Sequence, residues 1–249
     1  MNPLPSGLRW QAYGSGEPTT LIVHGLGATV GEARIPASGL PGTRVVVTLP
    51  SHSGTADAPD DYWNYPRIAE DLWAVACEVG ATRAIGVSLG AGALVALLAA
   101  RPHAFERVAL LLPATLDQPR AKQSVEDLVD AVELPDGVEA GDYLRARAAA
   151  FRRLAAAVAA LPGQVSVADP AVLARVSAPV LVVAATDDPL HPEQVAKATA
   201  AAFPNSVLEV FPSRTPLVTH RRELRALLVD FVGDLEPFDS EALGAFGLG

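Results

Sequence analysis

The sequence is poor in cysteine and in lysine, and each shortage narrows what the protein can be. Cys77 is the one cysteine among 249 residues, so the chain can form no intrachain disulfide. It falls within a helical pattern, where we expect a small buried residue. The only lysines are Lys122 and Lys197, while arginine and alanine are abundant, a composition typical of a GC-rich bacterial genome.

Long apolar runs and an excess of positive charge are also missing. No segment reaches the ~18 uninterrupted apolar residues of a membrane-spanning helix, and the first residues lack the basic and apolar regions of a secretory signal. The formal net charge is −9, whereas a nucleic-acid-binding protein needs a basic surface. We therefore expect a cytoplasmic protein that acts on a small molecule, without nucleic acid or membrane as a partner.

Patterns for metal and phosphate binding are equally lacking. No cluster of His, Cys or Asp has metal-ligand spacing, and no Gly-rich phosphate-binding loop is present. We therefore predict no metal and no other cofactor. Apolar residues, in contrast, make up 50% of the chain, enough for a sizeable core. The length fits one α/β domain with room for a small insertion.

The most informative stretch is Gly86-Val87-Ser88-Leu89-Gly90. An apolar, β-branched segment precedes it, and an Ala/Leu-rich run follows, which predicts a strand, a sharp turn and a helix. Such a turn forces Ser88 into a strained backbone conformation, and side chains in place of Gly86 and Gly90 would collide. Gly-x-Ser-x-Gly between a strand and a helix is typical of a nucleophile elbow, which exposes the serine hydroxyl at a helix N-terminus.

Strands and helices alternate along the chain, which predicts a doubly wound α/β architecture with a mostly parallel sheet. Strand-like runs are missing between 117 and 168, where we expect inserted helices. The α/β core would then comprise 1–116 and 169–249, and a small helical cap 117–168. The expected strands are 8–13, 19–23, 44–49, 83–87, 107–112, 178–185 and 206–211, and the expected core helices are 66–79, 91–100, 192–203 and 221–232.

Four segments together resemble the α/β-hydrolase fold superfamily, over residues 8–232. They are the elbow, His24-Gly25-Leu26-Gly27, Leu49-Pro50-Ser51-His52-Ser53 and Asp187-Asp188-Pro189-Leu190-His191-Pro192. The resemblance implies a serine hydrolase with Ser88 as the nucleophile. It also implies an oxyanion hole formed by the backbone N–H groups of Leu26 and Leu89.

The acid of the implied triad has two candidates, Asp187 and Asp188, which together follow a predicted strand. The family pattern Gly-x-x-Asp-Pro, in which Ala185 replaces the glycine here, selects Asp188. Asp187 would then be a turn residue that bonds to its own backbone. The order along the chain, with serine first, the acid second and the histidine last, is that of the family.

The base is the point at which this sequence departs from the family. Members usually carry Gly-His-x-Pro after the last strand, and this chain has Ser213-Arg214-Thr215-Pro216 there. An arginine cannot accept a proton in a protein. We predict instead that His220, six residues further on, returns over Ser88 on a longer loop, with His191 as the alternative base.

The expected substrate pocket involves His24, Trp63 and His191, with His24 shaping the oxyanion loop by hydrogen bonds. An apolar pocket in an acidic protein favours a small, mostly uncharged ester, lactone or thioester, and a carboxylesterase-like activity. A serine at the elbow disfavours epoxide and haloalkane hydrolysis, for which relatives of this fold normally use aspartate.

The competing hypothesis is a non-hydrolytic protein on the same fold, either a small-molecule-binding protein or an enzyme of another reaction class. Arg214 at the usual base position motivates it, because it suggests a degenerate triad. This hypothesis predicts that no base lies within hydrogen-bond reach of Ser88.

Overall fold

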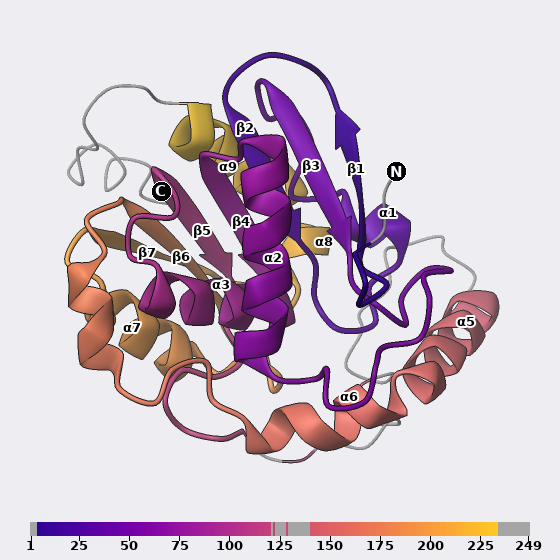
Figure 1. Ribbon diagram of the computed structural model, residues 1–249. Coiled ribbons are helices and arrows are strands. Elements are labelled where there is room, and N and C mark those ends of the chain that lie inside the picture. Colours follow the sequence, from indigo (N-terminus) through magenta and orange to yellow (C-terminus); the bar gives the residue numbers. More distant parts are fainter. Residues whose placement is uncertain (1–3, 121, 123–127, 129–139, 234–249) are drawn as a thin grey trace.

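A twisted sheet runs through the centre of the molecule (Figure 1). The computed structural model describes residues 4–120, 122, 128 and 140–233, and within them the sheet has seven strands in the order β1-β3-β2-β4-β5-β6-β7. β1 is antiparallel to β3, and the other neighbouring pairs are parallel. The strands are β1 (Arg9–Tyr13), β2 (Thr19–Val23), β3 (Thr43–Thr48), β4 (Arg83–Val87), β5 (Arg107–Leu111), β6 (Val180–Ala185) and β7 (Ser206–Phe211).

Helices cover both faces of the sheet, so each central strand is buried on two sides. Successive residues of β6 alternate between two apolar cores: Val182 belongs to one core, and Leu181 and Val183 to the other. The first core lies under α2 (Tyr65–Val79), α3 (Leu89–Ala100) and α7 (Glu193–Ala202), and the second lies under α1 (Val30–Ala33) and α9 (Arg221–Gly233). The doubly wound, mostly parallel architecture predicted from the sequence is confirmed.

Two further helices lie beyond the carboxyl ends of the strands, α5 (Ala140–Arg153) and α6 (Ala155–Ala160) (Figure 1). Phe151 of α5 lines the same cavity as Ser88. Both helices fall inside the segment 117–168 expected to form a cap, of which 121, 123–127 and 129–139 lie outside the described residues. The division into core and cap stays a prediction. The remaining short elements are the 3₁₀ helices η1 (Leu161–Gly163) and η2 (Pro170–Arg175) and the helical turn α8 (Pro216–Thr219).

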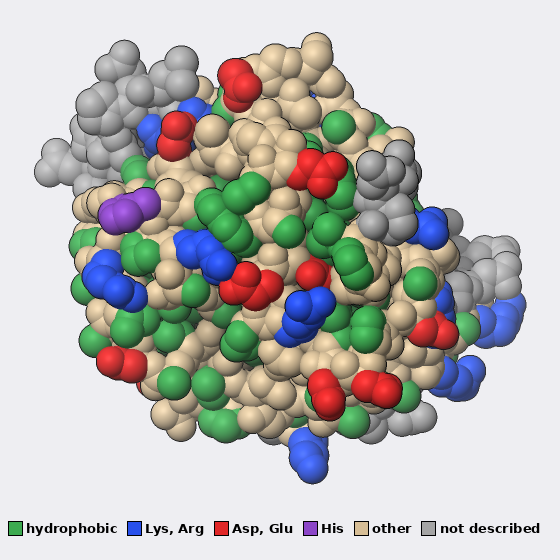
Figure 2. Space-filling model, in the orientation of Figure 1, with side chains coloured by type: hydrophobic (Ala, Val, Ile, Leu, Met, Phe, Trp, Pro, Cys, Tyr) green, Lys and Arg blue, Asp and Glu red, His purple; other side chains and the backbone are tan. Residues whose placement is uncertain are grey.

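The expected elements correspond closely to the observed ones, but the expectation for Cys77 is wrong. Its side chain is exposed on α2. Ile68 and Leu72 mark the buried face of that helix, and at 100° per residue Cys77 points about 180° away from Ile68. Among the described residues, no helix is both long enough and apolar enough to cross a membrane. On the face of the molecule shown in Figure 2, acidic, basic and hydrophobic side chains are interspersed.

Candidate active site

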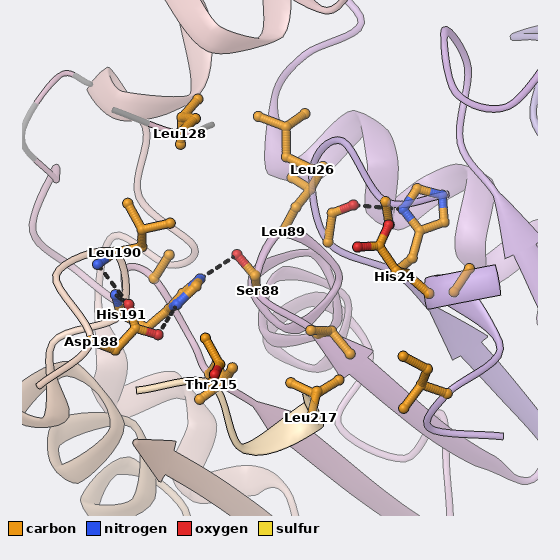
Figure 3. A pocket seen from close by; sticks show the side chains of 18 of the residues that line it. His24, Leu26, Ser88, Leu89, Leu128, Asp188, Leu190, His191, Thr215 and Leu217 are labelled. Carbon is orange, nitrogen blue, oxygen red and sulfur yellow. Dashed lines mark hydrogen bonds and ion pairs between the residues drawn. The ribbon is translucent and has the colours of Figure 1, made fainter. Parts of the chain in front are cut away.

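Ser88 joins β4 to α3 in a backbone conformation that few residues adopt. Its φ is 51° and its ψ −106°, a region in which an L side chain is strained. The N–H of Ser88 donates to the carbonyl of Leu111 at 2.9 Å, and its own carbonyl accepts from the N–H of Gly92 at 3.0 Å. These bonds fix the serine between β5 and α3. Its hydroxyl reaches the cavity at the carboxyl edge of the sheet (Figure 3).

The flanking glycines allow α3 to pack directly on the strands. A Cβ atom at Gly86 would lie 2.5 Å from the carbonyl oxygen of Gly90, and a Cβ at Gly90 would lie 2.4 Å from that of Val23. Neither position can take a side chain unless the backbone moves. The glycines therefore place the N-terminus of α3, and with it Ser88, beside the end of β2.

The imidazole that contacts Ser88 is that of His191 (Figure 3). Its Nε2 lies 2.8 Å from Ser88 Oγ, and its Nδ1 lies 2.6 Å from Asp188 Oδ2. The side chains of His191 and Asp188 are only 13% and 7% exposed, so solvent screens this pair little. A hydroxyl, an imidazole and a carboxylate are thus in line, in the geometry by which a catalytic triad activates its serine.

A tight turn after β6 brings Asp188 and His191 together. Asp188 Oδ1 accepts the backbone N–H groups of Leu190 at 2.8 Å and of His191 at 3.3 Å, while Asp187 adopts a left-handed φ of 58°. Burial raises the pKa of Asp188, but the hydrogen bond and charge of His191 and these two N–H groups outweigh it and hold the pKa below its ordinary value. Asp188 is therefore ionised at neutral pH.

His220 is not the imidazole beside Ser88, contrary to the expectation from the sequence. Its Nδ1 lies 2.9 Å from Thr219 Oγ1, and its ring packs against Phe211 with centroids 5.6 Å apart. The segment expected to form a long loop instead folds into the helical turn α8. The backbone N–H of His220 donates to the carbonyl of Pro216 at 3.0 Å, which fixes His220 where α8 meets α9.

The two expected oxyanion donors flank the serine. Leu89 is the first residue of α3, so its N–H is one of those that a helix leaves without an intrahelical partner, at the positive end of the helix dipole. Leu26 lies on the loop after β2 and lines the same cavity (Figure 3). Their placement is consistent with an oxyanion hole, which stays a proposal.

Two buried histidines hold the loop that carries Leu26. The N–H of Gly27 donates to His52 Nε2 at 3.0 Å, and the N–H of Leu49 donates to His24 Nε2 at 3.1 Å. The opposite nitrogen of each ring faces a backbone carbonyl of its own loop. An imidazole that accepts through one nitrogen and donates through the other is neutral. His24 therefore lines the cavity and shapes the loop, as expected, with both ring nitrogens already engaged.

Burial keeps both rings uncharged. It lowers the pKa of His24, and it lowers that of His52 to about 3, to which the neighbouring His24 and Arg153 also contribute. The two ring centroids lie 4.6 Å apart, too close for two positive charges in a buried site. The hydrogen bonds that His24 and His52 accept around the Leu26 loop therefore require both imidazoles to be neutral.

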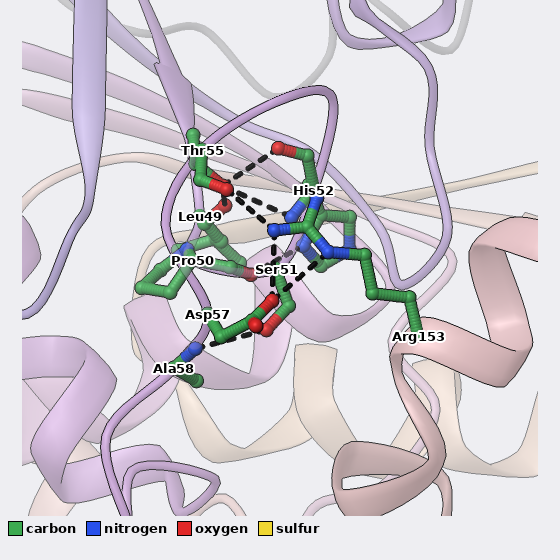
Figure 4. A network of polar contacts seen from close by, with 8 residues as sticks. All are labelled: Leu49, Pro50, Ser51, His52, Thr55, Asp57, Ala58 and Arg153. Carbon is green, nitrogen blue, oxygen red and sulfur yellow. Dashed lines mark hydrogen bonds and ion pairs between the residues drawn. The ribbon is translucent and has the colours of Figure 1, made fainter.

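Arg153 connects α5 to the loop that carries His52 (Figure 4). Its Nη2 donates to the carbonyl of Thr55 at 2.6 Å and to Asp57 Oδ1 at 2.8 Å. Thr55 Oγ1 in turn donates to the carbonyl of His52 at 2.6 Å. The ion pair is exposed and contributes roughly 0–1 kcal/mol at most. Its effect is to position α5 against the loop after β3.

The cavity in front of Ser88 has a volume of about 210 Å³ and mainly apolar walls. Trp63 does not line it, which corrects the expectation from the sequence. Its indole is 6% exposed and packs edge-on against His52 and Tyr62, because the segment before α2 folds into the core. Tyr65, at the start of α2, does line the cavity. The apolar part of the wall comes mainly from Leu26, Leu128, Phe151, Leu161, Leu190 and Leu217.

Three arginines also line the cavity, and the sequence motifs draw attention to only one of them, Arg214. Arg120 and Arg147 come from the segment 117–168, which carries no recognisable motif, so only the structure reveals them at the cavity. Arg214 also lines the cavity, at the position where the family usually has its base. In the described part of the chain, no group of three or more His, Cys, Asp or Glu residues is placed to hold a metal ion.

Comparison with known proteins agrees with this fold. The sequence matches the alpha/beta hydrolase family over residues 20–227. The chain therefore belongs to the alpha/beta hydrolase family. No curated protein matches it.

Solved structures with the same fold include three enzymes of low sequence identity. An esterase (EaEST) from Exiguobacterium antarcticum has a TM-score of 0.71 and 17% identity, covering 91% of this chain and 96% of that one. MGS-M2, an alpha/beta hydrolase enzyme from a Medee basin deep-sea metagenome library, has a TM-score of 0.75 and 14% identity, covering 93% and 96%. Est816, an N-acyl homoserine lactone degrading enzyme, has a TM-score of 0.72 and 20% identity, covering 90% and 96%. At these identities, the similarity establishes the shared fold.

Proposed function

We propose that this protein is a serine hydrolase that cleaves a small ester, lactone or thioester through an acyl-enzyme intermediate. One observation carries the proposal: Ser88 Oγ, the His191 ring and the Asp188 carboxylate form a continuous hydrogen-bonded chain, with links of 2.8 Å and 2.6 Å. A serine hydroxyl is a weak nucleophile at neutral pH and needs an adjacent base of this kind.

In the acylation step, Ser88 Oγ attacks the substrate carbonyl carbon while His191 Nε2 takes its proton. Asp188 holds Nδ1–H and stabilises the imidazolium that forms. The negative charge that develops on the carbonyl oxygen is stabilised by the N–H groups of Leu26 and Leu89, each worth roughly 3–4 kcal/mol in such a role. The imidazolium then protonates the departing alcohol, thiol or lactone oxygen, which leaves the acyl group on Ser88.

In the deacylation step, water attacks the acyl-enzyme. His191 Nε2 removes a proton from the water, and the same two N–H groups stabilise the second oxyanion. Collapse of the intermediate returns the proton to Ser88 Oγ and releases the carboxylic acid. The residues present can perform every step, and the mechanism uses no cofactor.

The cavity supports a small substrate with a carbonyl group. Its volume of about 210 Å³ lies below the range of roughly 300–1,000 Å³ that drug-sized ligands occupy. Esters, lactones and thioesters all place one carbonyl carbon beside a leaving group, so the same site can act on each. The esterase and the lactone-degrading enzyme that share the fold are consistent with this range of substrates.

The non-hydrolytic alternative rests on a degenerate triad and predicts that no base lies near Ser88. The contact of 2.8 Å between His191 Nε2 and Ser88 Oγ argues against that prediction. Arg214 does stand at the usual base position, but His191 occupies the space beside the serine hydroxyl. The hydrolase is therefore the better-supported proposal.

A fluorophosphonate probe tests the proposal directly, because it labels only an activated serine. We expect wild-type protein to be labelled at pH 7.5 and the Ser88→Ala variant to remain unlabelled. His191→Ala should lose labelling as well, since it lacks the base. Wild-type protein that resists the probe and also fails to hydrolyse 4-nitrophenyl acetate, butyrate and octanoate would overturn it.

A further inference from the structure

Arg214 brings a positive charge into the cavity wall with an unused hydrogen-bond donor. Its Nε is enclosed, and within the described part of the chain that atom has no hydrogen-bond partner. The loop that carries it follows β7 and leads into α8, so it lines the same cavity as Ser88 and His191. A buried donor without an acceptor is unfavourable, so a shift of this side chain toward the cavity, where a ligand supplies acceptor atoms, is favourable.

The other charged groups of the cavity wall are largely engaged with one another. Asp188 pairs with His191 at 2.6 Å. Glu32 lies 3.9 Å from Arg147 Nη1, and the Arg147 guanidinium also lies over the Phe151 ring, 4.9 Å from its centroid.

Among the described residues that line the cavity, positive side chains outnumber negative ones, although the protein as a whole carries −9. Three guanidinium groups line the cavity against two carboxylates: Arg120, Arg147 and Arg214 against Glu32 and Asp188. Both carboxylates already face a cationic or imidazole partner. A negatively charged group on the substrate could lie opposite Arg214 without disturbing either of these two pairs.

We propose that Arg214 binds a carboxylate of the substrate, so that the enzyme acts on a small ester, lactone or thioester that also carries a free carboxylate. This proposal rests on the proposed hydrolase function. The planar guanidinium offers two parallel N–H donors that match the two oxygens of a carboxylate. It differs from the expectation of a mostly uncharged substrate, which rested on apolar residues of the expected cap and did not include Arg214.

A carboxylate fits this site better than a phosphate ester does. One uncommitted guanidinium compensates a single negative charge, whereas a phosphate monoester carries nearly two at neutral pH and has three acceptor oxygens to satisfy. The limited volume of about 210 Å³ also favours the smaller planar group. The substrate class is therefore a short half-ester or a related acid in which carbonyl and carboxylate are a few carbons apart.

A matched pair of substrates tests this inference. Mono-4-nitrophenyl glutarate and 4-nitrophenyl butyrate have similar acyl chains, but only the first ends in a carboxylate. We expect Arg214→Gln to lower the ratio of kcat/KM for the glutarate over the butyrate at least tenfold, and Arg214→Lys to retain part of that ratio. Arg9→Gln, which removes an exposed arginine of β1 outside the cavity, should keep the wild-type ratio. A ratio that Arg214→Gln leaves within twofold of wild type would overturn the inference.

Direct binding separates failure of this inference from failure of the hydrolase proposal. Glutarate should raise the Tm of the wild-type protein, and glutaramide, its neutral analogue, should not. The rise should be lost in Arg214→Gln and retained in Arg9→Gln, whether or not any ester is hydrolysed. Absence of a glutarate effect on wild-type protein, or an equal effect of inorganic phosphate, would contradict a carboxylate site, while fluorophosphonate labelling reports separately on Ser88.

Discussion

The Asp188 side chain stabilises the turn that places His191 beside it. One carboxylate oxygen caps the backbone N–H groups of Leu190 and His191, and the other receives the imidazole Nδ1. The proposed acid and the proposed base thus come from one short loop, so their mutual geometry depends on local bonds. Only the approach to Ser88 depends on how the loop after β6 sits beside the elbow.

The identity of the base can be tested by comparing two histidines. His191→Ala should lower kcat/KM for 4-nitrophenyl acetate at least ~10³-fold, because Ser88 then has no proton acceptor. His220→Ala should stay within about threefold of wild type, since its ring contacts Thr219 and Phe211 rather than the serine. Equal losses in the two variants, or a larger loss in His220→Ala, would contradict the assignment.

The neighbouring aspartates allow a similarly matched comparison. Asp188→Asn should lower kcat by about 10⁴-fold, as expected when the orienting acid of such a triad loses its charge and the imidazole its tautomer. Asp187→Asn should be nearly silent, because asparagine tolerates the left-handed φ of 58° at that position. Steady-state kinetics on one ester measures both variants. A strong effect at Asp187 alone would assign the acid to that residue instead.

At the scale of the element, close packing fixes the arrangement of β4, Ser88 and α3, because there is no room for side chains at the flanking glycines. Gly90 lies so close to the end of β2 that a Cβ there would approach the carbonyl oxygen of Val23 to 2.4 Å. The strain at Ser88 persists because this packing leaves the chain no relaxed alternative. The helix that presents the serine and the loop that carries Leu26 are therefore fixed relative to each other.

Gly90→Ala should accordingly cost both stability and activity. We expect the free energy of unfolding to fall by about 1–3 kcal/mol, because the backbone of α3 must move away from β2. Gly163→Ala is the matched control, since a Cβ there meets nothing within 4 Å, and should change it by less than about 0.5 kcal/mol. Urea denaturation measures both. A Gly90→Ala protein as stable and active as wild type would show that the contact can relax freely.

At the scale of the whole molecule, neutral buried histidines make stability depend on pH. His52 has a pKa of about 3 in the folded protein against an ordinary value of 6.5. Between these values the unfolded chain binds the extra proton, so stability rises with pH in this window. The contribution is complete above the ordinary value and is lost as the pH falls toward 3. The lowered pKa of Asp188 acts in the same direction.

This coupling predicts the behaviour of a single substitution. His52→Gln keeps an acceptor for the N–H of Gly27 but cannot titrate. Relative to wild type, it should lose about 2 kcal/mol less free energy of unfolding between pH 8 and pH 5. His103→Gln, which removes an exposed histidine, should keep the wild-type pH dependence. If His52→Gln loses as much stability on acidification as wild type, protonation of His52 does not destabilise the fold.

Much of the fold, and half of the site, could be predicted from the sequence because the responsible signals are local. The pattern Gly86-x-Ser88-x-Gly90 stands directly between an apolar strand pattern and a helix pattern, and apolar periodicity marks each strand and helix. The elbow, the loop after β2 and the choice of Asp188 as the proposed acid all follow from short patterns. A parallel sheet then places the carboxyl ends of its strands at one edge, where the residues that follow them can meet.

Only the tertiary structure decided which imidazole meets Ser88 and what lines the cavity. The choice between His191 and His220 depends on whether the segment before α9 forms a loop or the helical turn α8, a difference of packing that no motif encodes. The arginines at 120 and 147, from the segment 117–168, meet Arg214 at the cavity, and Trp63 packs in the core. The sequence by itself thus determined the scaffold and the position of the proposed nucleophile. The proposed base and the character of the cavity wall were decided by contacts between segments far apart in the chain, because such contacts depend on the packing of the whole molecule.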